Sequence, residues 1–156
     1  MNKVLVFAFE GTISEKVLAQ LLCRYKLIIK SDAHKLDRYI ENILKENFTY
    51  IIGLGEYSGK DKDKLRVERQ CTNRFRNIIL GRQYESISIS EFLLPSSNTK
   101  LSMGIGNSYC NLISFLLASS IKSKKMNTQY GFIHVPKKFE IDRAVIEIRS
   151  LIQGFE

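Results

Sequence analysis

The sequence predicts an α/β fold: a single three-layer α/β/α domain with a mixed, largely parallel sheet. Short apolar runs rich in β-branched and aromatic residues alternate with segments whose apolar residues recur at helical spacing. This alternation is typical of a parallel sheet that is covered by helices on both faces. A chain of 156 residues, 44% of them hydrophobic, suits one compact domain over residues 1–156.

The N-terminal half alternates most clearly. Short apolar runs predict strands at 3–9 (KVLVFAF), 26–30 (KLIIK) and 48–55 (FTYIIGLG). Ser14 offers an N-cap for a helix after the first strand, and Asp32 offers one for a helix after the second. The second helix has an apolar face made of Leu36, Tyr39, Ile40, Ile43 and Leu44.

The C-terminal half shows a weaker pattern. Alternating residues predict strands within 65–71 (LRVERQC) and 84–94 (YESISISEFLL), and a helix follows Gly106. The run at 130–136 (YGFIHVP) predicts a last strand that ends at Pro136. A terminal helix carries an inward face made of Ile141, Ala144, Val145, Ile148, Leu151 and Ile152.

The formal charge of +8 raises the alternative of a basic nucleic-acid-binding module. However, the two most basic runs, GKDKDKLRVER and IKSKK, mix acidic residues or serines with their lysines and lack interleaved aromatic residues. Such runs are typical of solvated loops and helix ends, so we expect no nucleic-acid partner.

The cysteines indicate a reducing compartment. The chain has three, an odd number that is widely scattered, and its N-terminus lacks the features of a signal peptide. No apolar run approaches the roughly 20 residues of a membrane span. We therefore expect a cytoplasmic protein without a membrane partner, in which Cys23 on a helix and Cys71 on a strand are inert buried thiols.

Cys110 and His134 are the candidate reactive residues. Cys110 lies where a Gly/Asn/Ser turn meets a long apolar run (GNSYCNLISFLLASS), near the first turn of a predicted helix. Backbone N–H groups and the helix dipole at such a place lower the pKa of a thiol. His134, near the end of its strand, could exchange a proton with that thiol. The alternative is that Cys110 is only a small core residue.

Three segments extend this interpretation. Gly106 precedes YCNLISFLLASS, GFIHVP places His134 24 residues after Cys110, and VERQCTN supplies Glu68 and Asn73. In order and spacing these segments resemble the pyrrolidone-carboxylate peptidases, also called pyroglutamyl peptidases type I, which are cysteine peptidases. The N-terminal VLVFAFEG is similar to the strand and turn of the same family.

The resemblance implies a peptidase that removes N-terminal pyroglutamyl residues from peptides. Cys110 would be the nucleophile, His134 the acid and base, and Glu68 the residue that orients His134. Phe9 and Asn73 would bind substrate. The resemblance implies no metal or organic cofactor. It also implies a homo-oligomer, because relatives form dimers or tetramers.

The sequence also departs from the family. Two phenylalanines of the family sandwich the pyroglutamyl ring, but only Phe9 has a counterpart here, because FEGTIS lacks the Pro-Phe-Gly that follows. An inactive or repurposed relative that binds a small ligand or a protein is therefore a second hypothesis. Without the family, Glu68 would be read as a surface carboxylate paired with Arg66 or Arg69, and Phe9 as a core residue.

Overall fold

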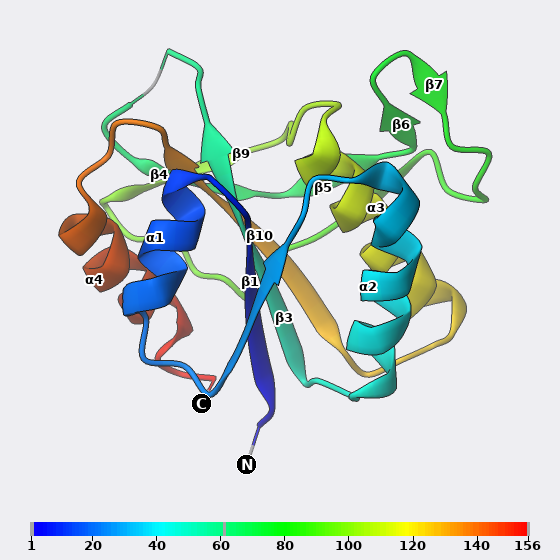
Figure 1. The fold of residues 1–156 in the computed structure, drawn as a ribbon, viewed down its shortest axis with the longest axis horizontal. Helices are drawn as coiled ribbons and strands as arrows, with labels where there is room; N and C mark the ends of the chain where they lie inside the picture. Colours follow the sequence, from blue (N-terminus) through cyan, green and yellow to red (C-terminus); the bar gives the residue numbers. More distant parts are fainter. Residues whose placement is uncertain (1, 61, 156) are drawn as a thin grey trace.

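The computed structural model describes residues 2–60 and 62–155, which form a mixed sheet between two layers of helices (Figure 1). The six-stranded sheet has the order β2-β1-β3-β10-β4-β9, and its pairs are parallel except for β10 with β4. Its strands are β1 (Val4–Phe9), β2 (Tyr25–Ile29), β3 (Tyr50–Tyr57), β4 (Leu65–Glu68), β9 (Thr99–Ser102) and β10 (Gln129–Pro136). The predicted fold class is confirmed.

Four helices cover the sheet in the described ranges. They are α1 (Ile13–Gln20), α2 (Ala33–Lys45), α3 (Tyr109–Ser123) and α4 (Ile141–Ile152). Figure 1 shows α1 and α4 on one face and α2 and α3 on the other. Two short ladders lie beside the sheet: β5 (Gln70–Thr72) pairs with β8 (Ser86–Ser88), and β6 (Arg74–Phe75) pairs with β7 (Ile78–Ile79).

Each face of the sheet supports its own apolar core, because successive side chains of a strand point to opposite faces. In β1, Phe7 packs with the core under α2 and α3, whereas Val6 packs with the core under α1 and α4. All six residues of β1 are buried. A central parallel strand with helices on both sides therefore needs a continuous apolar sequence, which is the signal that predicted it.

The first two helix caps differ in how well they were predicted. Thr12, not Ser14, caps α1: its hydroxyl accepts a hydrogen bond from the Glu15 amide at 3.4 Å, while the Glu15 carboxylate accepts one from the Gly11 amide at 2.6 Å. The two bonds pair backbone amides around the start of α1, whereas Ser14 is fully buried in the first turn. Asp32 caps α2 as predicted, accepting from the His34 amide at 3.0 Å.

Three other predictions need correction. Cys23 lies in the loop between α1 and β2, because α1 ends at Gln20. The strand expected over 84–94 is limited to Ser86–Ser88, since Ser90 adopts a positive φ of 59° and bonds to β10. The edge strand β9 was not predicted, because its sequence TKLS buries only its two ends and has no apolar run.

None of the described helices is long and apolar enough to cross a membrane. The three cysteines are not joined in disulfides.

Gly53, in the middle of β3, generates a prediction about stability. A Cβ atom at this position would lie 2.5 Å from Phe132 Cδ2 and 2.6 Å from Phe7 Cζ, so Gly53→Ala should displace both rings. We expect the free energy of unfolding in urea to fall by about 1–3 kcal/mol. Gly104→Ala is the control, because a Cβ atom there meets nothing within 4 Å. Equal stability of the two variants would contradict the packing described for β3.

Candidate active site

The carboxyl ends of three neighbouring strands form the floor of the site. His134 of β10 is in register with Gly55 of β3. Ala8 of β1 is in register with Leu54, so the next position along these parallel strands places Phe9 beside Gly55. Phe9, Gly55 and His134 thus form a row across the sheet, on the face covered by α2 and α3. This edge of an α/β sheet is where such folds carry their sites.

Cys110 lies above the middle of this row, in the first turn of α3. A Cβ atom at Gly55 would lie 2.8 Å from Cys110 Sγ and 2.8 Å from His134 Cδ2. The thiol and the imidazole therefore both pack directly on this glycine, and any larger residue would displace them. Because Nδ1 is bound by Glu68, Nε2 is the imidazole nitrogen that is left to exchange a proton with a neighbouring thiol.

Glu68 binds the other nitrogen of the imidazole. Its Oε1 lies 2.8 Å from His134 Nδ1, and both side chains are buried, with Glu68 fully excluded from solvent. Arg66 Nε lies 3.4 Å from the same oxygen. The alternative of an exposed surface carboxylate is therefore wrong for Glu68, because the antiparallel pairing of β4 with β10 turns this residue into the interior.

Burial dominates the chemistry of the Cys110 thiol. It raises the pKa of Cys110 to about 12, a hydrogen bond with the Ser108 side chain opposes this shift, and the negative charges of Glu68 and Glu56 add to it. The prediction that the helix start would lower this pKa is thus wrong for the resting protein. Although Cys110 is only partly buried as a residue, the loss of solvation around its sulfur outweighs the opposing hydrogen bonds.

Asn111 fixes the start of α3. The fully buried side chain accepts a hydrogen bond from the Thr72 amide and donates one to the Thr72 carbonyl, both at 2.9 Å, and also donates to the Arg74 carbonyl at 2.5 Å. These bonds tie the turn that carries Cys110 to the end of β5 and the start of β6. An asparagine beside the candidate cysteine was visible in the sequence, but its partners were not.

The two expected substrate-binding residues lie in different settings. Phe9 is 3% exposed and packs edge-on against Phe7, with ring centres 6.2 Å apart. It combines a core position with a place in the row next to Gly55. Asn73 lies between β5 and β6, where its side-chain amide donates to the Arg82 carbonyl at 3.0 Å. No hydrogen bond joins it to the described side chains of Cys110, His134 or Glu68, so its role stays a prediction.

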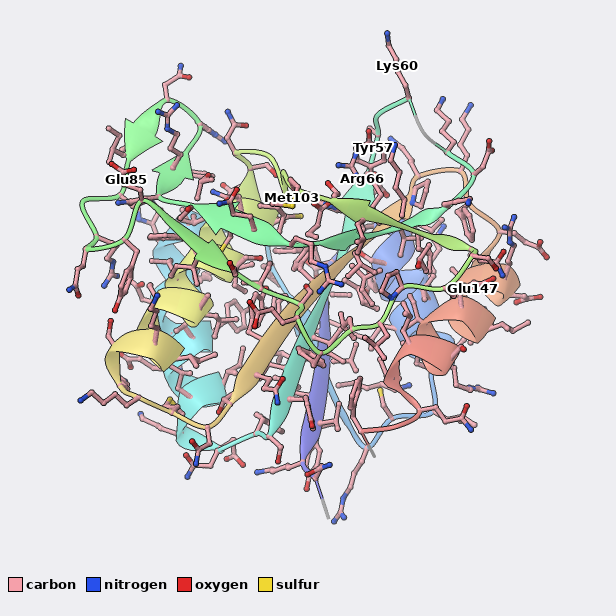
Figure 2. All side chains as sticks on the ribbon, turned by 180° about the vertical axis from the view of Figure 1, so that it is seen from behind. Tyr57, Lys60, Arg66, Glu85, Met103 and Glu147 are labelled. Atoms are coloured by element: carbon pink, nitrogen blue, oxygen red, sulfur yellow. The ribbon has the colours of Figure 1, made fainter. Side chains whose placement is uncertain are left out.

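Two further side chains border the imidazole. The Tyr57 ring lies 6.0 Å from the His134 ring, and the Arg66 guanidinium lies 4.0 Å from the centre of the Tyr57 ring. Figure 2 shows Tyr57 and Arg66 close together at one edge of the molecule. From the sequence, Arg66 was considered only as a partner of a surface carboxylate, because the strand pairing that brings it to His134 is not local.

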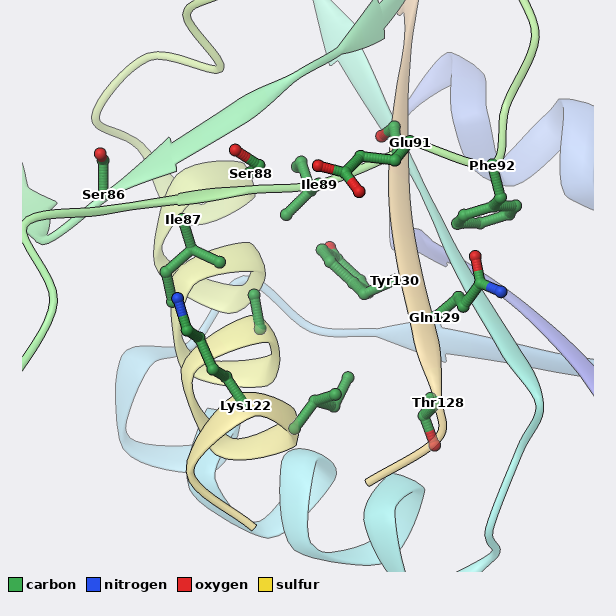
Figure 3. Close-up of a pocket in the computed structure, with 13 residues that line it drawn as sticks. Ser86, Ile87, Ser88, Ile89, Glu91, Phe92, Lys122, Thr128, Gln129 and Tyr130 are labelled. Atoms are coloured by element: carbon green, nitrogen blue, oxygen red, sulfur yellow. The ribbon is translucent and has the colours of Figure 1, made fainter. Parts of the chain in front are cut away.

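One cavity that the structure describes lies away from this site. A hollow of about 480 Å³ lies between the segment 86–92, the second half of α3 and the start of β10 (Figure 3). It is lined by Lys122 and Tyr130, whereas His134 lies four residues further along β10. Within residues 2–60 and 62–155, no group of three or more His, Cys, Asp or Glu side chains could hold a metal ion.

Comparisons with known proteins identify the fold. No family model matches the chain, and no curated protein matches its sequence. Among solved structures, pyroglutamyl peptidase I from Bacillus amyloliquefaciens aligns with a TM-score of 0.83 at 15% identity, covering 99% of this chain and 94% of that one. Pyrrolidone carboxyl peptidase from Thermococcus litoralis gives a TM-score of 0.80 at 17% identity, with 99% and 93% covered. The Thermus thermophilus enzyme gives 0.76 at 18%, with 96% and 98% covered.

The chain therefore has the fold of the pyrrolidone carboxyl peptidases over nearly its whole length. The resemblance inferred from the sequence is confirmed at the level of the fold.

The raised pKa of Cys110 leads to a spectroscopic prediction. A thiol with a pKa of about 12 is protonated at pH 7, so the difference in ultraviolet absorbance between the wild type and Cys110→Ala should lack a thiolate band. The band should appear only in strongly alkaline solution. A full thiolate band at neutral pH would show that the resting site holds an ion pair instead.

Proposed function

We propose that this protein is a cysteine peptidase that removes N-terminal pyroglutamyl residues from peptides. The observation that carries the proposal is the buried hydrogen bond between His134 Nδ1 and Glu68 Oε1, with the Cys110 thiol and the His134 ring both packed on Gly55. This arrangement occurs in a chain with the fold of pyroglutamyl peptidases. A nucleophile, a base and an orienting carboxylate at one sheet edge are the parts that acyl transfer requires.

Acylation begins with a neutral thiol. His134 Nε2 takes the proton from Cys110 Sγ as the sulfur attacks the carbonyl carbon that joins pyroglutamate to the next residue. The resulting tetrahedral intermediate collapses when the C–N bond breaks and the imidazolium donates its proton to the leaving amine. The pyroglutamyl group is then bound to Cys110 as a thioester, and the shortened peptide leaves.

Deacylation reverses these roles. His134 takes a proton from a water molecule that attacks the thioester carbonyl, and the C–S bond breaks with return of that proton to the sulfur. Pyroglutamate leaves and the thiol is restored. Glu68 stabilises the imidazolium in both steps through the bond to Nδ1, and backbone N–H groups in the first turn of α3 stabilise the oxyanion, worth about 3 kcal/mol per donor.

Phe9 is the proposed contact for the pyroglutamyl ring. It lies next to Gly55 in the row that also holds His134, so a substrate carbonyl near Cys110 places the ring toward β1. The residues after Phe9 form the cap of α1 instead of a second aromatic wall, and the Thr12 hydroxyl donates back to the Phe9 carbonyl at 2.7 Å. The ring therefore meets one phenylalanine face on this side.

A binding protein derived from the same fold is the second candidate. The turn after Phe9 favours it, because Thr12 and Glu15 are committed to the helix cap and offer no ring contact. In that case the site would hold a ligand without turnover.

We also propose a cytoplasmic location, where Cys110 stays reduced, and a homo-oligomeric state by analogy with the family that the sequence resembles. Peptides with N-terminal pyroglutamate are the proposed partners. No membrane or nucleic-acid partner is proposed.

The first functional prediction concerns the three residues of the site. Cys110→Ala and His134→Ala should each lower hydrolysis of a fluorogenic pyroglutamyl amide by at least about 1,000-fold, and Glu68→Gln by at least about 100-fold. Cys23→Ala and His34→Ala are the matched controls, since Cys23 lies in a loop and His34 is exposed on α2. Wild-type turnover by folded Cys110→Ala would contradict the proposal.

The second functional prediction concerns recognition of the ring. With one aromatic face, the enzyme should have a high KM for simple pyroglutamyl amides and should discriminate poorly against prolyl amides, since aromatic pairing adds only about 0.5–1.5 kcal/mol per pair. Phe9→Leu should lower kcat/KM for the pyroglutamyl substrate further, whereas the buried but distant Phe48→Leu should not. Strong discrimination that survives Phe9→Leu would show that the ring binds elsewhere, for example against Tyr57.

A further inference from the structure

The Glu68 carboxyl group is fully buried and has more than one described neighbour. The side chain is fully excluded from solvent, Oε1 contacts His134 Nδ1 at 2.8 Å, and Oε2 has no hydrogen-bond partner among the described residues. A buried carboxylate is costly unless it is paired with a positive charge. If His134 were the sole partner, the carboxylate would favour the imidazolium form, since a nearby opposite charge stabilises a charged group.

An imidazolium would be the wrong starting form for this site. The Cys110 thiol is protonated at neutral pH, because burial raises its pKa to about 12, so the first step needs a base. Only a neutral imidazole can accept the proton of the thiol. The proposed first step therefore needs His134 as a proton acceptor, and a second, permanent cation beside Glu68 would favour that form of the ring.

Arg66 supplies such a cation. It is in register with His134 on the antiparallel pair of β4 and β10, and Nε lies 3.4 Å from the Glu68 oxygen that binds Nδ1. The guanidinium is held from two other sides, since it donates to Ser102 Oγ at 2.5 Å and lies 4.0 Å from the centre of the Tyr57 ring. A guanidinium stays charged at any working pH, and this side chain is only 15% exposed, which limits screening by solvent.

We propose that Arg66 is a positioning residue, which shares Glu68 Oε1 with His134 and thereby keeps Glu68 ionised while His134 remains a neutral base. The inference deepens the proposed function, because it names the residue that prepares the base for Cys110. Arg66 lies two positions before Glu68 in β4, so both side chains point to the same face of the sheet.

Arg66 is the cation for which the structure describes an ion pair with Glu68, and Lys100 of β9 is in register with Arg66. On the same face, Tyr57 comes from β3, Cys110 from α3, and Glu68 and Arg66 from β4. Lys137, which follows β10, forms another ion pair with Glu56, 4.0 Å apart. Glu56 follows Gly55 in β3, so its side chain points to the opposite face, where it accepts a hydrogen bond from the Ile13 amide.

The test is the pH dependence of Cys110 alkylation by iodoacetamide, followed by mass spectrometry of the Cys110 peptide. In Arg66→Met and Arg66→Gln, loss of the cation favours the imidazolium, so the rise of the alkylation rate should move to higher pH by about one unit. Below that rise, the rate should be about tenfold lower than in the wild type. Arg66→Lys should restore most of the profile, and Arg143→Met, which removes an exposed charge on α4, should match the wild type.

Alkylation does not require hydrolysis, so the two proposals can fail separately. A shifted profile in a protein without peptidase activity would support the role of Arg66 and contradict the proposed function. An unshifted profile in folded Arg66→Met or Arg66→Gln would overturn the role of Arg66, even if the wild type hydrolyses pyroglutamyl amides. A shift in Arg66→Lys as large as in the two neutral variants would also overturn it, because a role of the charge requires rescue by lysine.

Discussion

The buried hydrogen bond between Glu68 and His134 is the constraint on which the rest of the site depends. It joins two strands, and it exists because β4 runs antiparallel to β10 in an otherwise parallel sheet. The same pairing brings Arg66 opposite His134, so one reversal of strand direction places a carboxylate and two partners together. A buried carboxylate must be compensated where it lies, and here the compensation orients the imidazole toward the thiol.

The second requirement is that Cys110 and His134 approach the sheet closely, which is possible because residue 55 is a glycine. Cys110 and His134 both occupy the space above Gly55, and Phe132 Cε1 lies 2.7 Å from the position of a Cβ atom there. The α3 helix can therefore bring its first turn down onto the sheet, where Asn111 fixes it through backbone groups of the neighbouring segment. The same packing removes solvent from the sulfur and raises the pKa of the Cys110 thiol. The thiol is therefore close to the sheet but protonated at neutral pH.

Local pattern was enough to predict the elements that bury continuous apolar runs, such as β1, β3 and β10, and the Asp32 cap of α2. It failed where tertiary contacts decide: β9 has no apolar run, and the strand around Ser86–Ser88 stops where Ser90 bonds to β10. For the site, residue type and position suggested Cys110 and His134, and the family resemblance added Glu68. The depth of the thiol and the pairing of Arg66 with Glu68 depend on strand register, which no local pattern encodes.

The most direct test of this account is the tautomer of His134. The protein contains two histidines, so nitrogen-15 labelling of histidine followed by long-range nitrogen–proton NMR gives a spectrum that His34→Ala assigns. If Glu68 orients the imidazole as described, neutral His134 carries its proton on Nδ1, donates it to Glu68, and leaves Nε2 free as the base for Cys110. A proton on Nε2 in the neutral ring, unchanged by Glu68→Gln, would contradict the account.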